Sequence, residues 1–159
     1  MNIWITEIIT RLKRSRCREG YMADTHSKVT RSYNMSRIRS KDTKPETMVR
    51  KYLFSKGLRF RKNDKRYRGH PDILLPKYKA AVFINGCFWH CHEGCPDFVI
   101  PKSNQGYWVP KLKKNHRRDE ENYAALRKDE WNVFIVWECE LKKTTRDERL
   151  EQLHLEITR

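Results

Sequence analysis

Residues 85–95 hold three cysteines and two histidines within eleven positions, and this segment constrains the fold more than any other part of the chain. Zinc binds four thiolate or imidazole ligands in a tetrahedron, and a tight loop can supply three while a distant strand end supplies the fourth. A further cysteine, Cys139, follows the apolar run 133–137. We therefore predict a closed, structural zinc site with the ligands Cys87, His92, Cys95 and Cys139.

Two alternatives to this ligand set are open from the sequence. Spacing alone allows Cys91 to replace His92 as a ligand. Reduced cysteines are also common buried residues that bind no metal.

The charge of the chain indicates the kind of partner. Its 159 residues fit one ordinary domain, and 35 Lys and Arg against 20 Asp and Glu give a net charge of +15. Such a balance favours a polyanionic partner. No apolar run approaches the roughly 18 residues that span a bilayer, and the N-terminal apolar stretch lacks the preceding basic residues of a secretory signal. We expect a cytoplasmic protein.

Periodicity and caps predict an α/β fold. Thr43 to Glu46 has the form of a capping box and opens a helix over 44–56. Apolar residues at helical spacing predict a long basic helix over about 108–129, and a last helix is expected over 145–156. Short strands are predicted at 58–62, 72–75, 79–85 and 133–137, the second and third forming a hairpin. This order indicates a mixed sheet flanked by helices.

The N-terminal region is strongly basic. Residues 1–21 form a basic extension that we expect to be disordered. Five basic residues and no acids lie between Lys28 and Lys41, interleaved with side chains that donate to phosphate, so Arg31 is a candidate DNA contact. A solvated surface loop has the same composition and is the alternative.

A second candidate site begins at Asp72, which opens an apolar strand after Pro71. A carboxylate at a sheet edge suits Mg²⁺, which needs only one or two protein oxygens besides water and phosphate. Alone, such an aspartate is more often a turn residue that caps a strand. The basic charge, Glu46 on the preceding helix and His90 after the partner strand together predict a metal-dependent phosphodiesterase.

Two aromatic clusters lie beside cationic residues. Phe88 and Trp89 adjoin the predicted zinc ligands, and Trp108 opens the basic helix that carries Lys111, Lys113 and Lys114. Aromatic rings flanked by cations suit insertion between bases with phosphates held on either side. Packing in the core is the alternative for any single ring.

Several motifs together resemble the very-short-patch repair (Vsr) endonucleases. They are Thr30-Arg31-Ser32 with Asn34-Met35, Pro71-Asp72, Val82-Phe83, the run 86–90, Asn115 to Asp119, and Trp137-Glu138-Cys139. The resemblance covers residues 22–141 and leaves 142–159 as a charged C-terminal helix. It implies a restriction-endonuclease-like fold, a structural zinc, and Mg²⁺-dependent nicking of duplex DNA 5′ to the T of a T·G mismatch. That mismatch arises when a methylated cytosine deaminates.

The resemblance also implies roles for individual residues. Asp72 and the main-chain carbonyl of Ile84 would bind Mg²⁺, His90 would handle the attacking water with Asp119 orienting it, and Glu46 would assist near the metal. The zinc ligands would be Cys87, His92, Cys95 and Cys139, and the intercalating aromatic residues would be Phe88, Trp89 and Trp108. Two positions depart from the family pattern. Asn85 stands where a second active-site histidine can occur, and Cys95 lies one residue further from His92 than a His-x-Cys spacing would place it.

The resemblance implies partners as well. We expect a monomer that acts on mismatched duplex DNA, with mismatch-repair proteins and a cognate cytosine methyltransferase in the same cell. A zinc-stapled DNA-binding module without catalysis is the alternative function. Asp72 and His90 discriminate between the two, because a module that only binds DNA needs neither.

Overall fold

The computed structural model of the chain describes residues 29–30, 33, 36–37 and 41–159. Contacts divide the chain into two units, Met1–Ile38 and Arg39–Arg159, and the account below concerns the second. The predicted extension over residues 1–21 and the candidate DNA contact Arg31 lie outside the described residues.

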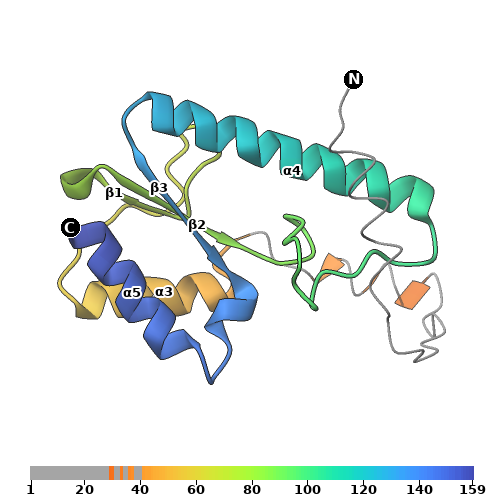
Figure 1. The fold of residues 1–159 in the computed structure, drawn as a ribbon, viewed down its shortest axis with the longest axis horizontal. Coiled ribbons are helices and arrows are strands. Elements are labelled where there is room, and N and C mark those ends of the chain that lie inside the picture. The colour runs from red at the N-terminus through yellow and green to blue at the C-terminus, as the bar shows by residue number, and fades with distance from the viewer. Residues whose placement is uncertain (1–28, 31–32, 34–35, 38–40) are drawn as a thin grey trace. The chain divides into compact units, whose positions relative to one another are not determined.

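A three-stranded mixed sheet forms the centre of the second unit (Figure 1). Strand β1 (Ile73–Leu75) pairs antiparallel with β2 (Ala80–Asn85), and β3 (Asn132–Trp137) pairs parallel with β2. The predicted hairpin is confirmed: the 3-10 turn η1 (Pro76–Tyr78) connects β1 to β2, and Lys79 closes it in a left-handed conformation at φ 44°. The predicted mixed sheet is therefore confirmed, as is its α/β class.

Helix α3 (Lys44–Ser55) begins as the sequence predicts. The Thr43 side chain accepts from the Glu46 N–H, and the Glu46 carboxylate accepts from the Thr43 N–H, so the capping box is complete. Gly57 follows the helix at φ 81°, a conformation that glycine adopts without strain.

Helix α4 (Gln105–Lys128) makes the connection between the two parallel strands. It begins three residues before the predicted start, so Pro110 lies in its second turn, not its first. After β3, the short 3-10 helix η2 (Glu138–Leu141) leads to α5 (Arg146–Thr158), close to the predicted 145–156.

Helices cover both faces of the sheet (Figure 1). Alternate strand residues pack against α3 and α5 on one face, where Val49, Leu53 and Leu153 are fully buried. The other strand residues pack against α4 through Tyr123 and Leu126. Among the described residues, no helix is long and apolar enough to cross a membrane.

The strand predicted at 58–62 is wrong. Only Arg61 pairs with the sheet, exchanging two backbone hydrogen bonds with Leu74 at 2.8 and 2.9 Å. Asn63 then takes a left-handed conformation at φ 46°, which turns the chain away from β1 before a second pair can form.

Candidate active site and metal centre

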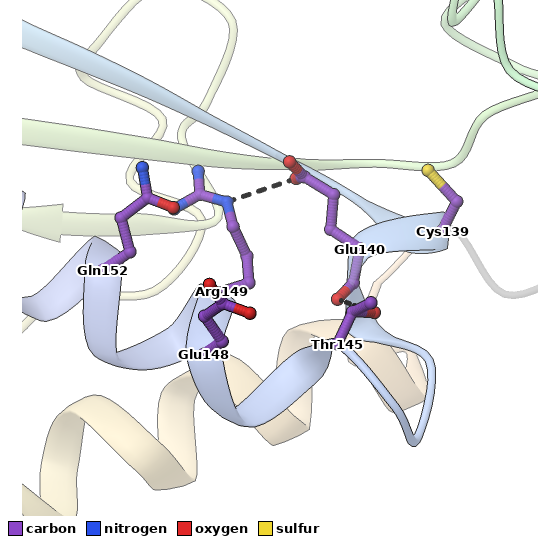
Figure 2. A pocket seen from close by; sticks show the side chains of 6 residues that line it. All are labelled: Cys139, Glu140, Thr145, Glu148, Arg149 and Gln152. Carbon is purple, nitrogen blue, oxygen red and sulfur yellow. Dashed lines mark hydrogen bonds and ion pairs between the residues drawn. The ribbon is translucent and has the colours of Figure 1, made fainter.

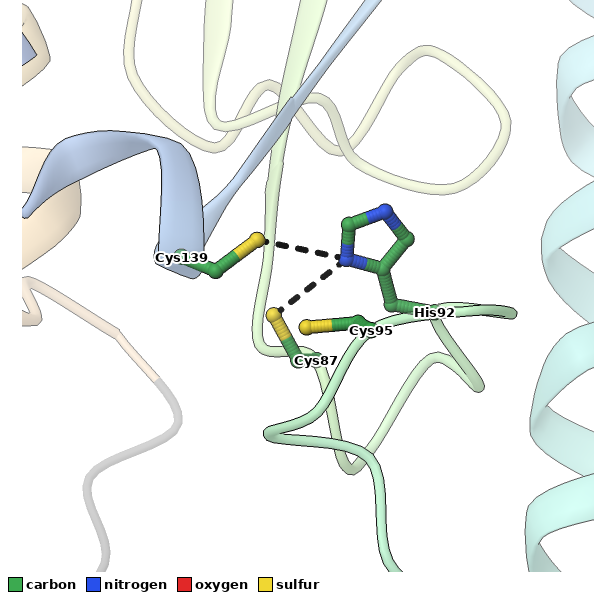
Figure 3. Close-up of side chains that lie close together, drawn as sticks. All are labelled: Cys87, His92, Cys95 and Cys139. Atoms are coloured by element: carbon green, nitrogen blue, oxygen red, sulfur yellow. Dashed lines mark hydrogen bonds between the residues drawn. The ribbon is translucent and has the colours of Figure 1, made fainter. Parts of the chain in front are cut away.

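Four side chains converge at the ends of β2 and β3 (Figure 3). The ligand atoms of Cys87, His92, Cys95 and Cys139 all lie within 4.8 Å of one another. His92 Nδ1 is 3.5 Å from Cys87 Sγ and 3.4 Å from Cys139 Sγ. A tetrahedral zinc ion with ordinary bond lengths separates its ligand atoms by about 3.5 to 3.8 Å, so the cluster fits such an ion.

The parallel pairing of β2 and β3 explains how Cys87 meets Cys139. Asn85 pairs with Trp137, and each cysteine follows its strand by two residues. Parallel strands end at the same edge of a sheet, so the residues that follow the two strands are neighbours there. The His92 ring stacks on the Trp137 ring with centroids 4.0 Å apart, which fixes the imidazole over the strand end.

Cys91 lies outside this cluster. Its Sγ donates to the Leu112 carbonyl of α4 at 3.5 Å, and its backbone is left-handed at φ 55°. Gly94, at φ 75°, then folds the chain so that Cys95 turns back to the cluster. The geometry therefore favours His92 over Cys91 as a ligand. Burial raises the pKa of the Cys87 and Cys139 thiols, so a bound cation is needed to hold them as thiolates.

An ion pair braces the strand end that carries Cys139 (Figure 2). Glu140 Oε2 accepts from the Trp137 N–H at 2.7 Å and lies 3.3 Å from Arg149 Nε of α5. Arg149 Nη2 also donates to the Ile135 carbonyl at 3.1 Å. Glu140 and Arg149 line a shallow pocket of about 350 Å³ beside Cys139. The contacts tie α5 to β3 and fix the turn that presents the cysteine.

Asp72 lies immediately before β1, with its carboxylate turned to the end of β2. Its Oδ2 accepts from the Ile84 N–H at 2.7 Å. Burial is the main cause that raises the pKa of Asp72 to about 6, and nearby Glu46 raises it further. The Ile84 N–H, Arg50 and His90 act in the opposite direction. A bound cation would stabilise the ionised form of this carboxylate, because it replaces the hydration that the carboxylate loses on burial.

Arg50 links Glu46 to the backbone of Asp72. The buried Glu46 carboxylate accepts from the Asp42 N–H at 3.0 Å, from Thr43 Oγ1 at 2.9 Å and from Arg50 Nη2 at 2.9 Å. The same Nη2 donates to the Asp72 carbonyl at 3.0 Å. Glu46 is thus engaged in the helix cap and an ion pair, and its link to Asp72 is indirect.

His90 and Asp119 form a second pair at this edge. His90 Nδ1 lies 2.6 Å from Asp119 Oδ2, which brings the loop after β2 onto the middle of α4. Arg118 Nη2 is 3.3 Å from the other carboxylate oxygen. If the carboxylate accepts the proton on Nδ1, the lone pair on Nε2 remains available to accept a proton.

The three predicted intercalating rings form one cluster. Ring centroids are 5.1 Å apart for Phe88 and Trp89, 5.4 Å for Phe88 and Trp108, and 5.9 Å for Trp89 and Trp108. All three side chains are half-buried. Lys111 Nζ lies 5.5 Å from each indole ring, within cation–π range, while Lys113 and Lys114 are exposed on α4.

Comparison of the sequence with known proteins identifies the family. The family model "DNA mismatch endonuclease Vsr" matches residues 23–97. A type II nicking enzyme of Neisseria meningitidis is 53% identical over 137 residues, 86% of this chain and 97% of its own length. The chain belongs to the Vsr family. Another type II nicking enzyme, from Xanthomonas oryzae, is 46% identical over 76% of this chain and 88% of its own length. The Escherichia coli DNA mismatch endonuclease Vsr is 40% identical over 82% of this chain and 87% of its own length.

Membership of the Vsr family makes the protein a DNA endonuclease with a restriction-endonuclease-like fold. The alternative of a DNA-binding module without catalysis is therefore set aside. Three residues of this Vsr-family site, Arg50, Tyr123 and Arg149, were not found by sequence reasoning. Each acts through a contact with a residue that is distant in the sequence, and no local pattern signals such a contact.

Tyr123 contacts Asn85, one of the two positions that depart from the family pattern. The buried Asn85 donates from Nδ2 to Tyr123 Oη at 2.8 Å, so its amide is held against α4. Both residues line a pocket of about 270 Å³ that also includes His90 and Asp119. In this Vsr-family protein an amide that does not titrate thus lines the same pocket as the His90–Asp119 pair.

Proposed function

We propose that this endonuclease nicks one strand of duplex DNA 5′ to the T of a T·G mismatch, by Mg²⁺-dependent hydrolysis. The observation that supports it most is the convergence of Asp72 and the His90–Asp119 pair, close enough for His90 to affect the Asp72 carboxylate. The name of the E. coli relative gives mismatched DNA as its substrate, and the Neisseria relative is a nicking enzyme.

Asp72 and the Ile84 carbonyl would hold the Mg²⁺, with water and phosphate oxygens completing the shell. When bound, the ion supplies charge neutralisation at the scissile phosphate. His90 Nε2 accepts a proton from the attacking water, and Asp119 holds the imidazole in the correct tautomer. Glu46 and Arg50 position the Asp72 backbone.

We assign the Cys/His cluster to zinc in a structural role. Three thiolates and one imidazole are a typical donor set for zinc, and four protein ligands leave no position for substrate. The ion would fix the loop that carries His90, Phe88 and Trp89.

The biological setting follows from the proposed substrate. A T·G mismatch forms when 5-methylcytosine deaminates, so the substrate is chromosomal DNA. We propose that the protein acts there as a monomer, in the cytoplasm at the nucleoid. A cytosine methyltransferase would create its substrate, and mismatch-repair proteins would share the pathway.

A nicking assay tests the proposed function. The zinc-loaded protein is incubated with end-labelled duplexes that differ only in a T·G or a T·A pair. We expect one nick, 5′ to the mismatched T, only in the T·G duplex and only with Mg²⁺ added. Cleavage of both duplexes, or cleavage without a divalent cation, would contradict the proposal.

His90→Ala is expected to slow single-turnover nicking by about 10² to 10⁴, the usual contribution of a positioned acid–base group. His154→Ala is the matched control, because His154 lies on α5 and does not line the pocket that contains His90 and Asp119. A rate for His90→Ala equal to that of the control would assign His90 a structural role.

Trp89→Ala is expected to reduce nicking of the T·G duplex far more than binding to matched DNA. A mispaired step unstacks at lower cost, so an inserted ring recovers stacking energy of about 1 to 3 kcal/mol there. Lys113→Ala, which removes only a charge, should weaken binding to both duplexes about equally. Equal losses on both duplexes for Trp89→Ala would place mismatch recognition elsewhere.

A further inference from the structure

The segment 59–68, here called the basic loop, has no role in the site described above. It carries six exposed cationic side chains and a single acid. The cations are Arg59, Arg61, Lys62, Lys65, Arg66 and Arg68, and the acid is Asp64.

Internal hydrogen bonds give the basic loop a defined conformation. The Asp64 carboxylate accepts from the Arg66 backbone N–H at 3.2 Å and from its guanidinium at 2.9 and 2.6 Å. The Tyr67 N–H donates to the Asp64 carbonyl at 3.3 Å, and Arg61 is tied to β1 at Leu74. The one acid therefore shapes the loop and uses Arg66 to do so.

The basic loop is also fixed against α4. Tyr67 packs edge-on against Trp131 with ring centroids 4.8 Å apart. Next to the loop, Gly69 approaches so closely that an added Cβ would lie 3.1 Å from both Asn122 Cβ and Phe83 Cε1. The end of the loop at Arg68, next to Gly69, is therefore held beside α4 at Asn122.

Two of the cations, Lys65 and Arg68, have neither an acidic partner nor an aromatic ring contact within the described part of the chain. Arg66 pairs with Asp64, Arg61 lies 3.8 Å from Asp64, and Lys62 lies 3.8 Å from Asp42. The Arg59 guanidinium lies over the Phe54 ring. Lys65 and Arg68 form no ion pair with any described residue. A folded loop that presents two cations without ion-pair partners is suited to bind an anion from outside.

Helix α4 relates the basic loop to the catalytic pair. Along the helix, Asp119 lies five residues after Lys114 and three before Asn122, about 8 Å and about 5 Å at the usual rise. The catalytic pair therefore lies between two basic surfaces, the lysines at 111–114 and the basic loop. Arg68 also precedes Asp72 by four residues, a separation of at most about 14 Å.

We propose that Lys65 and Arg68 bind backbone phosphates of the substrate near the nick, Arg68 within about four nucleotides of it and Lys65 within about seven, forming a second phosphate-binding surface. Lys65 precedes Asp72 by seven residues, a separation of at most about 25 Å. Each DNA strand carries one charge per about 3.4 Å of axis, so reaches of about 14 Å and about 25 Å span about four and about seven phosphates. The proposal rests on the proposed function only in placing the scissile phosphate at Asp72.

Salt dependence of binding tests the proposal. The double variant Lys65→Ala/Arg68→Ala is compared with Lys77→Ala/Lys128→Ala, which removes two exposed lysines at the opposite end of the sheet. Binding to a matched duplex is measured against NaCl concentration without Mg²⁺. Each phosphate contact contributes about 0.9 to the slope of log K against log salt, so the test variant should lose about 1.8. The control should keep the slope of the wild type. A slope equal to that of the control would overturn the proposal. That slope is also what we expect if the partner of the basic loop is an acidic protein, because the loop would then make no contact with DNA.

A second measurement locates the contacts. Single neutral methylphosphonates are placed along each strand of the T·G duplex, around the nick. The wild type should lose affinity at positions within about seven nucleotides of the nick, and the Lys65→Ala/Arg68→Ala variant should lose none at those same positions. Equal sensitivity of both proteins at every position would refute the assignment. Because the salt experiment needs neither a mismatch nor cleavage, it is decisive even where T·G nicking fails.

Discussion

Asp72→Asn is expected to abolish Mg²⁺-dependent nicking of the T·G duplex while binding to DNA persists. The substitution replaces the carboxylate that would bind Mg²⁺ by a neutral amide, and it leaves the basic surfaces unchanged. Asp129→Asn, which removes one exposed carboxylate at the end of α4, is the control and should nick like the wild type. Single-turnover nicking and binding to the same duplex are the two measurements. Nicking by Asp72→Asn at the rate of the control would refute the metal-binding role.

A stability measurement separates this loss of nicking from unfolding. The Asp72 pKa is about 6 in the folded protein, against an ordinary value of 3.8, so its ionised form opposes folding. A difference of about two pKa units is worth about 3 kcal/mol. The sign is that of a raised pKa: the stabilising effect of the protonated form is present below about pH 4 and is lost as the pH rises through about 6.

Without added Mg²⁺, and with the Cys/His site loaded, Asp72→Asn should therefore be more stable than the wild type at about pH 8. The difference should shrink toward about pH 4, and urea unfolding at both pH values measures it. A destabilised variant at the higher pH would show that the Ile84 hydrogen bond outweighs the desolvation of the carboxylate.

Cys139→Ser is expected to unfold or aggregate the protein and to remove the one tightly bound zinc that we propose for the Cys/His cluster. Structural zinc sites contribute about 10 to 16 kcal/mol in small domains, as much as the whole stability of an ordinary fold. Cys91→Ser is the matched control and should keep both zinc and fold, because Cys91 Sγ contacts the Leu112 carbonyl and lies outside the ligand cluster. Metal analysis and thermal unfolding are the measurements. A soluble, zinc-free and active Cys139→Ser protein would exclude the structural role.

The parts of the fold that the sequence predicted are those with local signals. The capping box at Thr43 set the start of α3, and apolar periodicity located α4 although its first turn was missed. The segment 58–62 has the composition of a strand, but the left-handed Asn63 and the Asp64 turn end its pairing after one residue. Local composition therefore predicts elements better than it predicts where their pairing stops.

The candidate site shows the same division. Cys87 and Cys139 were found because each follows an apolar strand and zinc demands four ligands. Arg50, in contrast, donates to the carbonyl of Asp72, which is 22 residues away in the sequence. Arg149 lies on α5 and contacts Glu140 of η2, the preceding helix. Such contacts depend on how helices pack against the sheet, which periodicity does not encode.

The long connection between β2 and β3 has a consequence for how the enzyme is made. Parallel strands cannot be joined by a tight turn, so all of α4 is synthesised between Cys95 and Cys139. A nascent or truncated chain that stops within α4 carries three of the four candidate ligands and His90, but lacks the strand that completes the cluster. Under the proposed structural role of the cluster, incomplete copies would lack the ligand set that orders the loop carrying His90. The proposed nicking activity would then arise only after Cys139 has been synthesised.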